Sequence, residues 1–132
     1  LRDVDAPEAE WIDQQRANGM LVFTAHDVAS KGMAEVMHRV RAAVASSPVH
    51  VSFDIDVVDP SLAPGTGTPV PGGMTKDDLL PLLRALGLLN IVCMDLVEVN
   101  PSLDDGDQTA QLAAAIAVDA LEGTVVHTMS CT

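Results

Sequence analysis

Two apolar, strand-like segments flank a helical segment in the second half of this chain, and this order constrains its fold most strongly. Residues 48–56, "PVHVSFDID", alternate apolar and polar side chains, which is the period of a half-buried strand. Residues 90–99, "NIVCMDLVEV", are apolar enough to predict a strand that is buried on both faces. Between them, Thr75 with Asp78 three residues later is an N-cap signal for a helix, in which Pro81 predicts a kink or a later start. Alternating helices and apolar strands are typical of an α/β fold with a parallel sheet.

The other segments predict further helices around this unit. Asp5, the acids that follow it and Gly19 frame a capped helix of about three turns. Residues 20–25 predict a short buried strand, and residues 27–47 predict one amphipathic helix because their apolar side chains recur at helical spacing. Residues 107–123 predict an alanine-rich helix that ends at its final glycine.

Size and charge limit the possible partners. The 132 residues fit one domain, and 19 acidic against 7 basic side chains give a net charge of −12. This charge repels phosphate backbones and anionic lipids, so we expect no nucleic-acid or membrane partner, whereas a small cationic ligand or metal ions fit its sign. No apolar run approaches the ~20 residues of a membrane span. Cys93 and Cys131 are too far apart for a metal pair or a disulfide framework, which predicts a reducing, cytoplasmic location.

Three aspartates lie close together at the end of the first predicted strand. Residues two apart on a strand share a face, so we expect Asp54 and Asp56 to lie side by side at the carboxyl edge of the sheet, where α/β proteins bind ligands. Adjacent carboxylates repel unless solvent, a shared proton or a cation lies between them, and their oxygens favour Mg²⁺, Ca²⁺ or Mn²⁺. Asp59, before Pro60, is predicted to cap a turn. The spacing alone leaves open a solvated strand end, a calcium loop or a phosphotransfer aspartate.

A loop rich in proline and glycine follows the aspartates. Four prolines and four glycines between residues 60 and 73 make this loop both rigid and specifically bent. A long loop inside a compact domain is often functional, and Thr66 and Thr68 offer hydroxyls to a ligand. Glu98 ends the next predicted strand. It faces the same crevice if the strands are parallel neighbours, although a helix cap or a surface acid fits its position equally.

The motif "SFDIDVVDPSLAPGTGTPVPGG", together with "VEVNPSLD", resembles the ureohydrolase family of arginases and agmatinases. The opening "LRDVD" and the asparagine of "EVNP" are similar to the arginase branch in particular. The resemblance extends from Leu1 to about Glu122 and matches the C-terminal portion of a family member. It implies an α/β fold with a three-layer parallel sheet and helices on both faces, present here as an incomplete copy. Residues 1–132 are then the C-terminal part of a single ureohydrolase domain.

The same resemblance implies a site with two Mn²⁺ ions. Asp54 is expected to bridge both ions and to act in catalysis, and Asp56 is expected to hold the second ion. Glu98, also catalytic, is expected to pair with the guanidinium group of the substrate. Family members are usually trimers or hexamers, so a homo-oligomer is expected.

Three more residues match substrate-binding positions of the family. Thr68 is expected to lie in the substrate loop. Asp5, with Glu8 nearby, is expected to bind the α-amino end of arginine. Arg2 and Asp3, in the same motif, are expected to act as structural supports.

The chain departs from the family pattern in its histidines. The other metal ligands of the family, and its proton-shuttling histidine, lie upstream of the equivalent of Leu1, so we expect further residues before this chain in the complete enzyme. "TAHDVA" around His26 is superficially similar to a ligand motif but lies in the wrong part of the chain. His38, His50 and His127 are expected to be structural or to face solvent.

The sequence therefore predicts Mn²⁺-dependent hydrolysis of a guanidino compound, with L-arginine, cleaved to L-ornithine and urea, as the preferred substrate. A guanidinium carbon is a poor electrophile, so its hydrolysis needs hydroxide at neutral pH, which a metal supplies. The alternatives are an agmatinase or another guanidino-acid hydrolase, and, from another class, a non-catalytic assembly subunit or an inactive fragment. Two aspartates cannot complete the coordination of two ions, so this chain alone is expected to be inactive.

Overall fold

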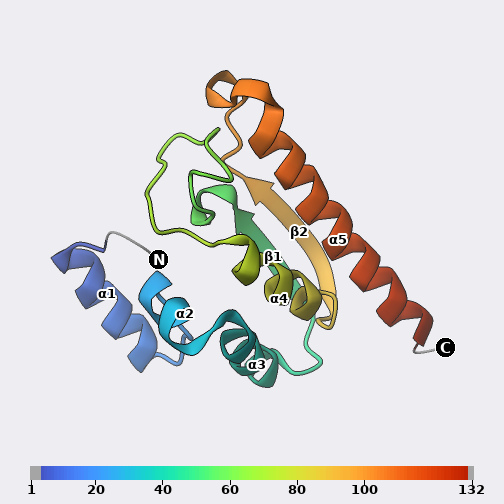
Figure 1. Ribbon diagram of the computed structural model, residues 1–132. Helices are drawn as coiled ribbons and strands as arrows, with labels where there is room; N and C mark the ends of the chain where they lie inside the picture. The colour runs from blue at the N-terminus through green and yellow to red at the C-terminus, as the bar shows by residue number, and fades with distance from the viewer. Residues whose placement is uncertain (1–3, 131–132) are drawn as a thin grey trace.

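A computed structural model describes the backbone of residues 4–130 and the side chains of residues 4–122. In this range two strands and five α-helices follow one another along the chain, joined by loops and short 3₁₀ turns (Figure 1). These elements are α1 (Ala6–Ala17), α2 (Ala25–Lys31), α3 (Met33–Val44), β1 (Val49–Asp54), α4 (Lys76–Leu86), β2 (Ile91–Val97) and α5 (Gln108–Ser130).

Strands β1 and β2 pair in parallel and form the sheet of the described residues. Val49 lies opposite Ile91 and Asp54 lies opposite Val97, so the carboxyl ends of both strands meet at one edge. Helix α4 provides the crossover that a parallel connection requires. The predicted α/β class with a parallel sheet is confirmed.

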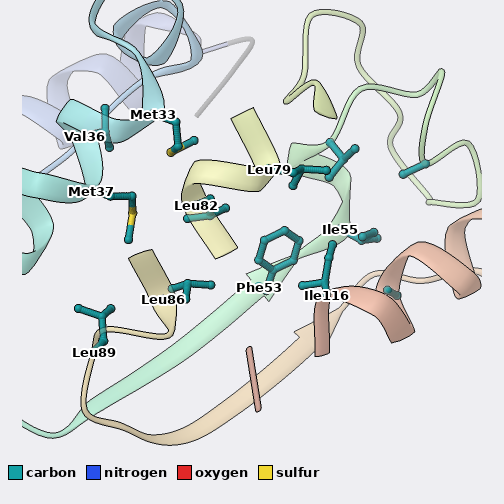
Figure 2. Packing of buried hydrophobic residues seen from close by; sticks show 13 residues of the cluster. Met33, Val36, Met37, Phe53, Ile55, Leu79, Leu82, Leu86, Leu89 and Ile116 are labelled. Atoms are coloured by element: carbon teal, nitrogen blue, oxygen red, sulfur yellow. The ribbon is translucent and has the colours of Figure 1, made fainter. Parts of the chain in front are cut away.

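One face of the sheet is covered by a layer of helices. In β1, Phe53 is buried and Val49 and Val51 are partly buried on the same side, as the alternating pattern predicts. Helix α3 packs against α4, and α4 packs against α5, so these helices share that side. Figure 2 shows leucines of α4 directed towards Phe53, with Ile116 of α5 beside it. Burying a side chain of this size contributes about 1.5–3 kcal/mol, so this cluster holds the layer on the sheet.

The opposite face of the sheet is open in the described part of the chain. His50, Ser52 and Cys93 are exposed there, and Val97 on the same face is 38% exposed. The prediction that the second strand is buried on both faces is therefore wrong for this chain, because helices cover one face of it.

Three other predictions about helices and strands were also wrong. The predicted strand at residues 20–25 is absent, since residues 20–24 form a loop and Ala25 begins α2. The single helix predicted at residues 27–47 is divided at Gly32, whose φ of 81° places it in the left-handed region that interrupts an α-helix. Helix α5 continues beyond the glycine that was expected to end it.

Helix α4 begins where its cap is, and Pro81 does not delay it. The amide of Thr75 donates to Asp78 Oδ2 over 2.9 Å, and this capping box starts the helix at Lys76. Of the two alternatives predicted from Pro81, a kink or a later start, the later start does not occur, because the proline lies inside the helix. Within the described residues, no helix combines the length and apolar character needed to cross a membrane.

Candidate functional site

A cavity of about 760 Å³ lies at the carboxyl end of β1. Its walls come from the first turns of α1 and α2, the residues that follow β1, and the end of the proline- and glycine-rich loop with the start of α4. The side chains with polar groups on these walls are Glu8, Thr24, Asp54, Asp56, Thr68, Thr75 and Asp78. The cavity occupies the sheet edge at which α/β proteins bind ligands.

Asp54 and Asp56 both line this cavity, but a strand face does not bring them together. Asp54 is the last residue of β1, whereas Asp56 belongs to a 3₁₀ turn, Ile55–Val57. The expectation that the alternation of a strand places both side chains on one face is therefore wrong. The turn places them together instead, because Asp54 Oδ1 accepts a hydrogen bond of 3.1 Å from the amide of Asp56.

The charge of Asp54 is disfavoured at this edge. Partial burial raises the pKa of Asp54, the hydrogen bond from the Asp56 amide opposes this effect, and the negative charges of Asp56 and Glu98 reinforce it. A cation would relieve this accumulation of charge, and carboxylate oxygens suit a hard cation such as Mn²⁺. Among the described residues, no three or more His, Cys, Asp or Glu side chains are arranged to hold a metal. The two aspartates therefore fit part of a metal site.

Glu98 lies directly after β2, at the same sheet edge. The pairing of Asp54 with Val97 brings Glu98 close enough for its charge to raise the pKa of Asp54. Its side chain is exposed and does not line the cavity. Its φ of 67° is uncommon for a residue other than glycine, and such conformations cluster at functional sites.

The two threonines of the loop have different environments. Thr68 lines the cavity and its hydroxyl donates to Asp56 Oδ2 over 3.1 Å. Thr66 is 1% exposed, and its hydroxyl accepts a hydrogen bond of 3.3 Å from the amide of Thr68. The expectation that both hydroxyls face a ligand therefore fails for Thr66.

Asp5 and Glu8 form the capping box of α1. Asp5 Oδ1 accepts from the amide of Glu8 at 2.9 Å, and Glu8 Oε2 accepts from the amide of Asp5 at 3.1 Å. Of the two side chains, Glu8 lines the cavity and Asp5 does not. Arg2 and Asp3, predicted as structural supports, lie outside the described residues.

Sequence reasoning missed several residues of the cavity wall. Thr75 and Asp78 were predicted only as a helix cap, and Thr24 of α2 was not singled out, yet all three line the cavity. The helix cap predicted at Thr75 and Asp78 is confirmed, because they form a capping box, and Thr24 caps α2 in the same way. What the sequence could not show is that two helix N-termini approach the end of β1.

None of the described histidines lines the cavity. His38 is exposed, as expected, and His26 is exposed as well. His50 lies on the open face of the sheet, where its Nε2 is 2.7 Å from Asp95 Oδ2. The side chain of His127 lies outside the part that the structure describes.

Comparison with known proteins identifies the family to which this arrangement belongs. The family model for the arginase family matches residues 1–122. The chain belongs to the arginase family. An agmatinase from Proteus mirabilis is 51% identical over 104 residues, which cover 79% of this chain and 34% of that relative. The resemblance to ureohydrolases is thereby confirmed.

Solved structures extend the match to the fold. Proclavaminate amidino hydrolase from Streptomyces clavuligerus matches with a TM-score of 0.79 and 43% identity, covering 84% of this chain and 38% of that one. Arginase from Bacillus caldovelox matches with a TM-score of 0.78 and 35% identity, covering 91% of this chain and 40% of that one. The arginase-like fold is confirmed as a partial copy, since the chain spans about a third of the length of the curated relatives it matches.

Proposed function

We propose that this chain forms part of a Mn²⁺-dependent ureohydrolase that hydrolyses a guanidino compound to urea and an amine. The observation that carries the proposal is the pair Asp54 and Asp56 in one cavity, with the hydroxyl of Thr68 on Asp56. Membership of the arginase family and the similarity to agmatinases, arginases and an amidino hydrolase support it.

Asp54 and Asp56 would hold the metal, which lowers the pKa of a bound water and so supplies hydroxide at neutral pH. Thr68 fixes the carboxylate of Asp56 through its hydrogen bond, and the amide of Asp56 fixes that of Asp54. Glu98 lies at the same edge, outside the cavity wall, and would pair with the guanidinium group of a substrate that extends to this edge. Two carboxylates do not complete the coordination of two metal ions, so further ligands would have to join Asp54 and Asp56.

For the substrate, we propose agmatine in preference to L-arginine. The charged side chains that line the cavity in the described residues are all acidic: Glu8, Asp54, Asp56 and Asp78. Such a wall repels the carboxylate of arginine, a group that agmatine lacks, and attracts the two positive charges of agmatine without that opposing effect. Relatives that are 46–51% identical to this chain are agmatinases. Glu8, which lines the cavity, is the proposed partner of the distal ammonium group, and Asp5 supports it through the capping box.

Urea release by the full-length protein with Mn²⁺ tests this proposal. We expect kcat/KM for agmatine to exceed that for L-arginine and for 4-guanidinobutyrate by at least about tenfold, the factor that corresponds to ~1.4 kcal/mol. Glu8→Gln should lower kcat/KM for agmatine by about 10–100-fold, because a hydrogen bond to a charged group contributes about 1.5–3 kcal/mol. Glu10→Gln, an exposed acid of the same helix, is the matched control. Equal rates for the three substrates would contradict the proposed preference.

An assembly subunit without catalytic activity is the alternative from another class. A full-length protein that binds no Mn²⁺ and releases no urea would favour it. The homo-oligomeric state and the cytoplasmic location remain predictions, which sedimentation and fractionation of the native protein test.

A further inference from the structure

The proline- and glycine-rich loop is attached at Gly65 to two distant segments of the chain. The amide of Gly65 donates to Thr109 Oγ1 over 2.8 Å, and its carbonyl accepts from the amide of Asn100 at 2.8 Å. Both backbone groups of Gly65 are therefore bonded to the region between β2 and α5. The light-green part of this loop approaches the orange start of α5 (Figure 1).

The attachment point leaves no room for a side chain at Gly65. A Cβ atom placed there would lie 2.4 Å from Asp104 Cβ and 2.9 Å from Asp104 Cα. Contacts this short are not tolerated in proteins, and Asp104 cannot move away because its carboxylate is bonded on both oxygens. Asp104 Oδ1 accepts from the amide of Thr109 and Oδ2 accepts from the amide of Ala110, each over 2.8 Å.

Asp104 and Thr109 are built into the structure as buried polar residues. Asp104 is 6% exposed and Thr109 is 0% exposed. Burial raises the pKa of Asp104, but the amides of Thr109 and Ala110 and the hydroxyl of Thr109 together lower it, so Asp104 is a fixed anion at the start of α5. A buried threonine hydroxyl that bonds a loop amide holds that loop in one position.

From Gly65 a short series of contacts leads to the cavity. The hydroxyl of Thr66, buried next to the anchor, accepts from the amide of Thr68. The hydroxyl of Thr68 then donates to Asp56 Oδ2. These two hydrogen bonds connect the segment next to Gly65 with Asp56 in the cavity.

We infer that Thr109 and Asp104 are positioning residues for the cavity: they hold Gly65, and through the loop they hold the hydroxyl of Thr68 against Asp56. The functional part of this inference rests on the proposed function, in which Asp56 is a metal ligand. Neither residue touches the cavity itself, since Thr109 and Asp104 do not line it. Partners that orient a metal ligand typically change metal affinity when they are lost.

The test compares Thr109→Val, which keeps the shape and removes the hydroxyl, with Thr109→Ser, which keeps the hydroxyl. In the full-length protein without metal, amide hydrogen exchange of residues 65–68 should be about tenfold faster in Thr109→Val, because one buried hydrogen bond is worth about that factor. Thr109→Ser should exchange nearly as slowly as the wild type. Gln111→Ala, an exposed residue on the same helix, is the control and should leave exchange unchanged.

Mn²⁺ titration tests the second half of the inference. Thr109→Val should weaken Mn²⁺ binding by about 10–100-fold, and Thr109→Ser should restore it. Thr68 is exposed, so we expect Thr68→Val to fold normally. This variant should weaken Mn²⁺ binding to a similar degree, but the amide of Gly65 should exchange no faster than in the wild type. The variant that combines Thr109→Val with Thr68→Val should bind Mn²⁺ no more weakly than either single variant, because both substitutions act through the same carboxylate of Asp56.

Two results would overturn the inference. The first is equal exchange of residues 65–68 in the valine and serine variants, and the second is unchanged Mn²⁺ affinity in Thr68→Val. A wild type that binds no Mn²⁺ and releases no urea would instead refute the proposed function, while the exchange comparison would still decide whether Thr109 anchors the loop.

Discussion

The aspartates that follow β1 differ in pKa because their hydrogen bonds, burial and charged neighbours differ. Hydrogen bonds from the hydroxyl and amide of Ser61 and from the amides of Gly72 and Gly73 lower the pKa of Asp59 to about 2. Asp54 has the opposite shift, because partial burial and nearby negative charges raise its pKa. Asp59 is therefore ionised at neutral pH and connects the two ends of the loop, whereas the ionised form of Asp54 is the one that a nearby cation would stabilise.

Asp54→Asn should raise the thermal midpoint of the metal-free protein at pH 7. The folded-state pKa of Asp54 is raised, so its ionised form destabilises the fold at neutral pH, and asparagine removes that charge while its oxygen still accepts from the amide of Asp56. The difference between variant and wild type should disappear as the pH falls below 3.8, the ordinary value, since the carboxyl group is then protonated in both states.

Calorimetry of the metal-free protein from pH 7 to pH 3 measures this effect. Asp119→Asn, an exposed acid on α5, is the matched control and should leave the midpoint nearly unchanged. A lower midpoint for Asp54→Asn at pH 7 would show that its charge is compensated within the protein.

The loop between β1 and α4 is an element whose shape depends on close backbone approach. Asp59 accepts from the amides of Gly72 and Gly73 at 2.9 and 3.3 Å, so the two ends of the loop meet. The next residue, Met74, lies beside the start of the loop, where its amide donates to the carbonyl of Val57. This closure returns the chain to the cavity wall at the start of α4.

Gly73→Ala should destabilise the protein by about 1–3 kcal/mol, the usual cost of overpacking. A Cβ at this position would lie 2.4 Å from the amide nitrogen of Asp59 and 2.5 Å from the carbonyl carbon of Val58, and backbone cannot yield cheaply. Gly67→Ala provides the comparison, because a Cβ there has nothing within 4 Å. Urea denaturation of both variants measures the difference in their free energies of unfolding. Equal midpoints would mean that the backbone at Gly73 is not packed closely against Val58 and Asp59.

For the whole molecule, electrostatics favour cationic ligands. The net charge of −12 and the acidic cavity lining act in the same direction. A negative field of this kind raises the rate at which cations arrive, and salt screens it over a distance of about 10 Å at 0.1 M ionic strength.

This field predicts that kcat/KM for agmatine falls as salt is added to the full-length enzyme. L-arginine, with one net positive charge fewer at neutral pH, should show a shallower dependence, because steering scales with the charge of the ligand. Steady-state rates between low and physiological ionic strength measure both slopes. Identical slopes for the two substrates would indicate that the field contributes nothing to their capture.

Local patterns in the sequence determined most helices, both strands and the residues of the motif. Alternation in residues 49–54 and the capping boxes at Asp5 and Thr75 depend only on neighbours in the chain, so they could be predicted. The strand expected at residues 20–25 failed because apolar composition alone does not provide a partner strand.

The tertiary structure alone decided how these residues meet. It placed Glu8 rather than Asp5 on the cavity wall, buried Thr66, and joined Gly65 to Thr109 across 44 positions of sequence. No periodicity encodes such contacts, because they depend on the approach of backbone segments whose separation is fixed only when the helical layer packs on the sheet.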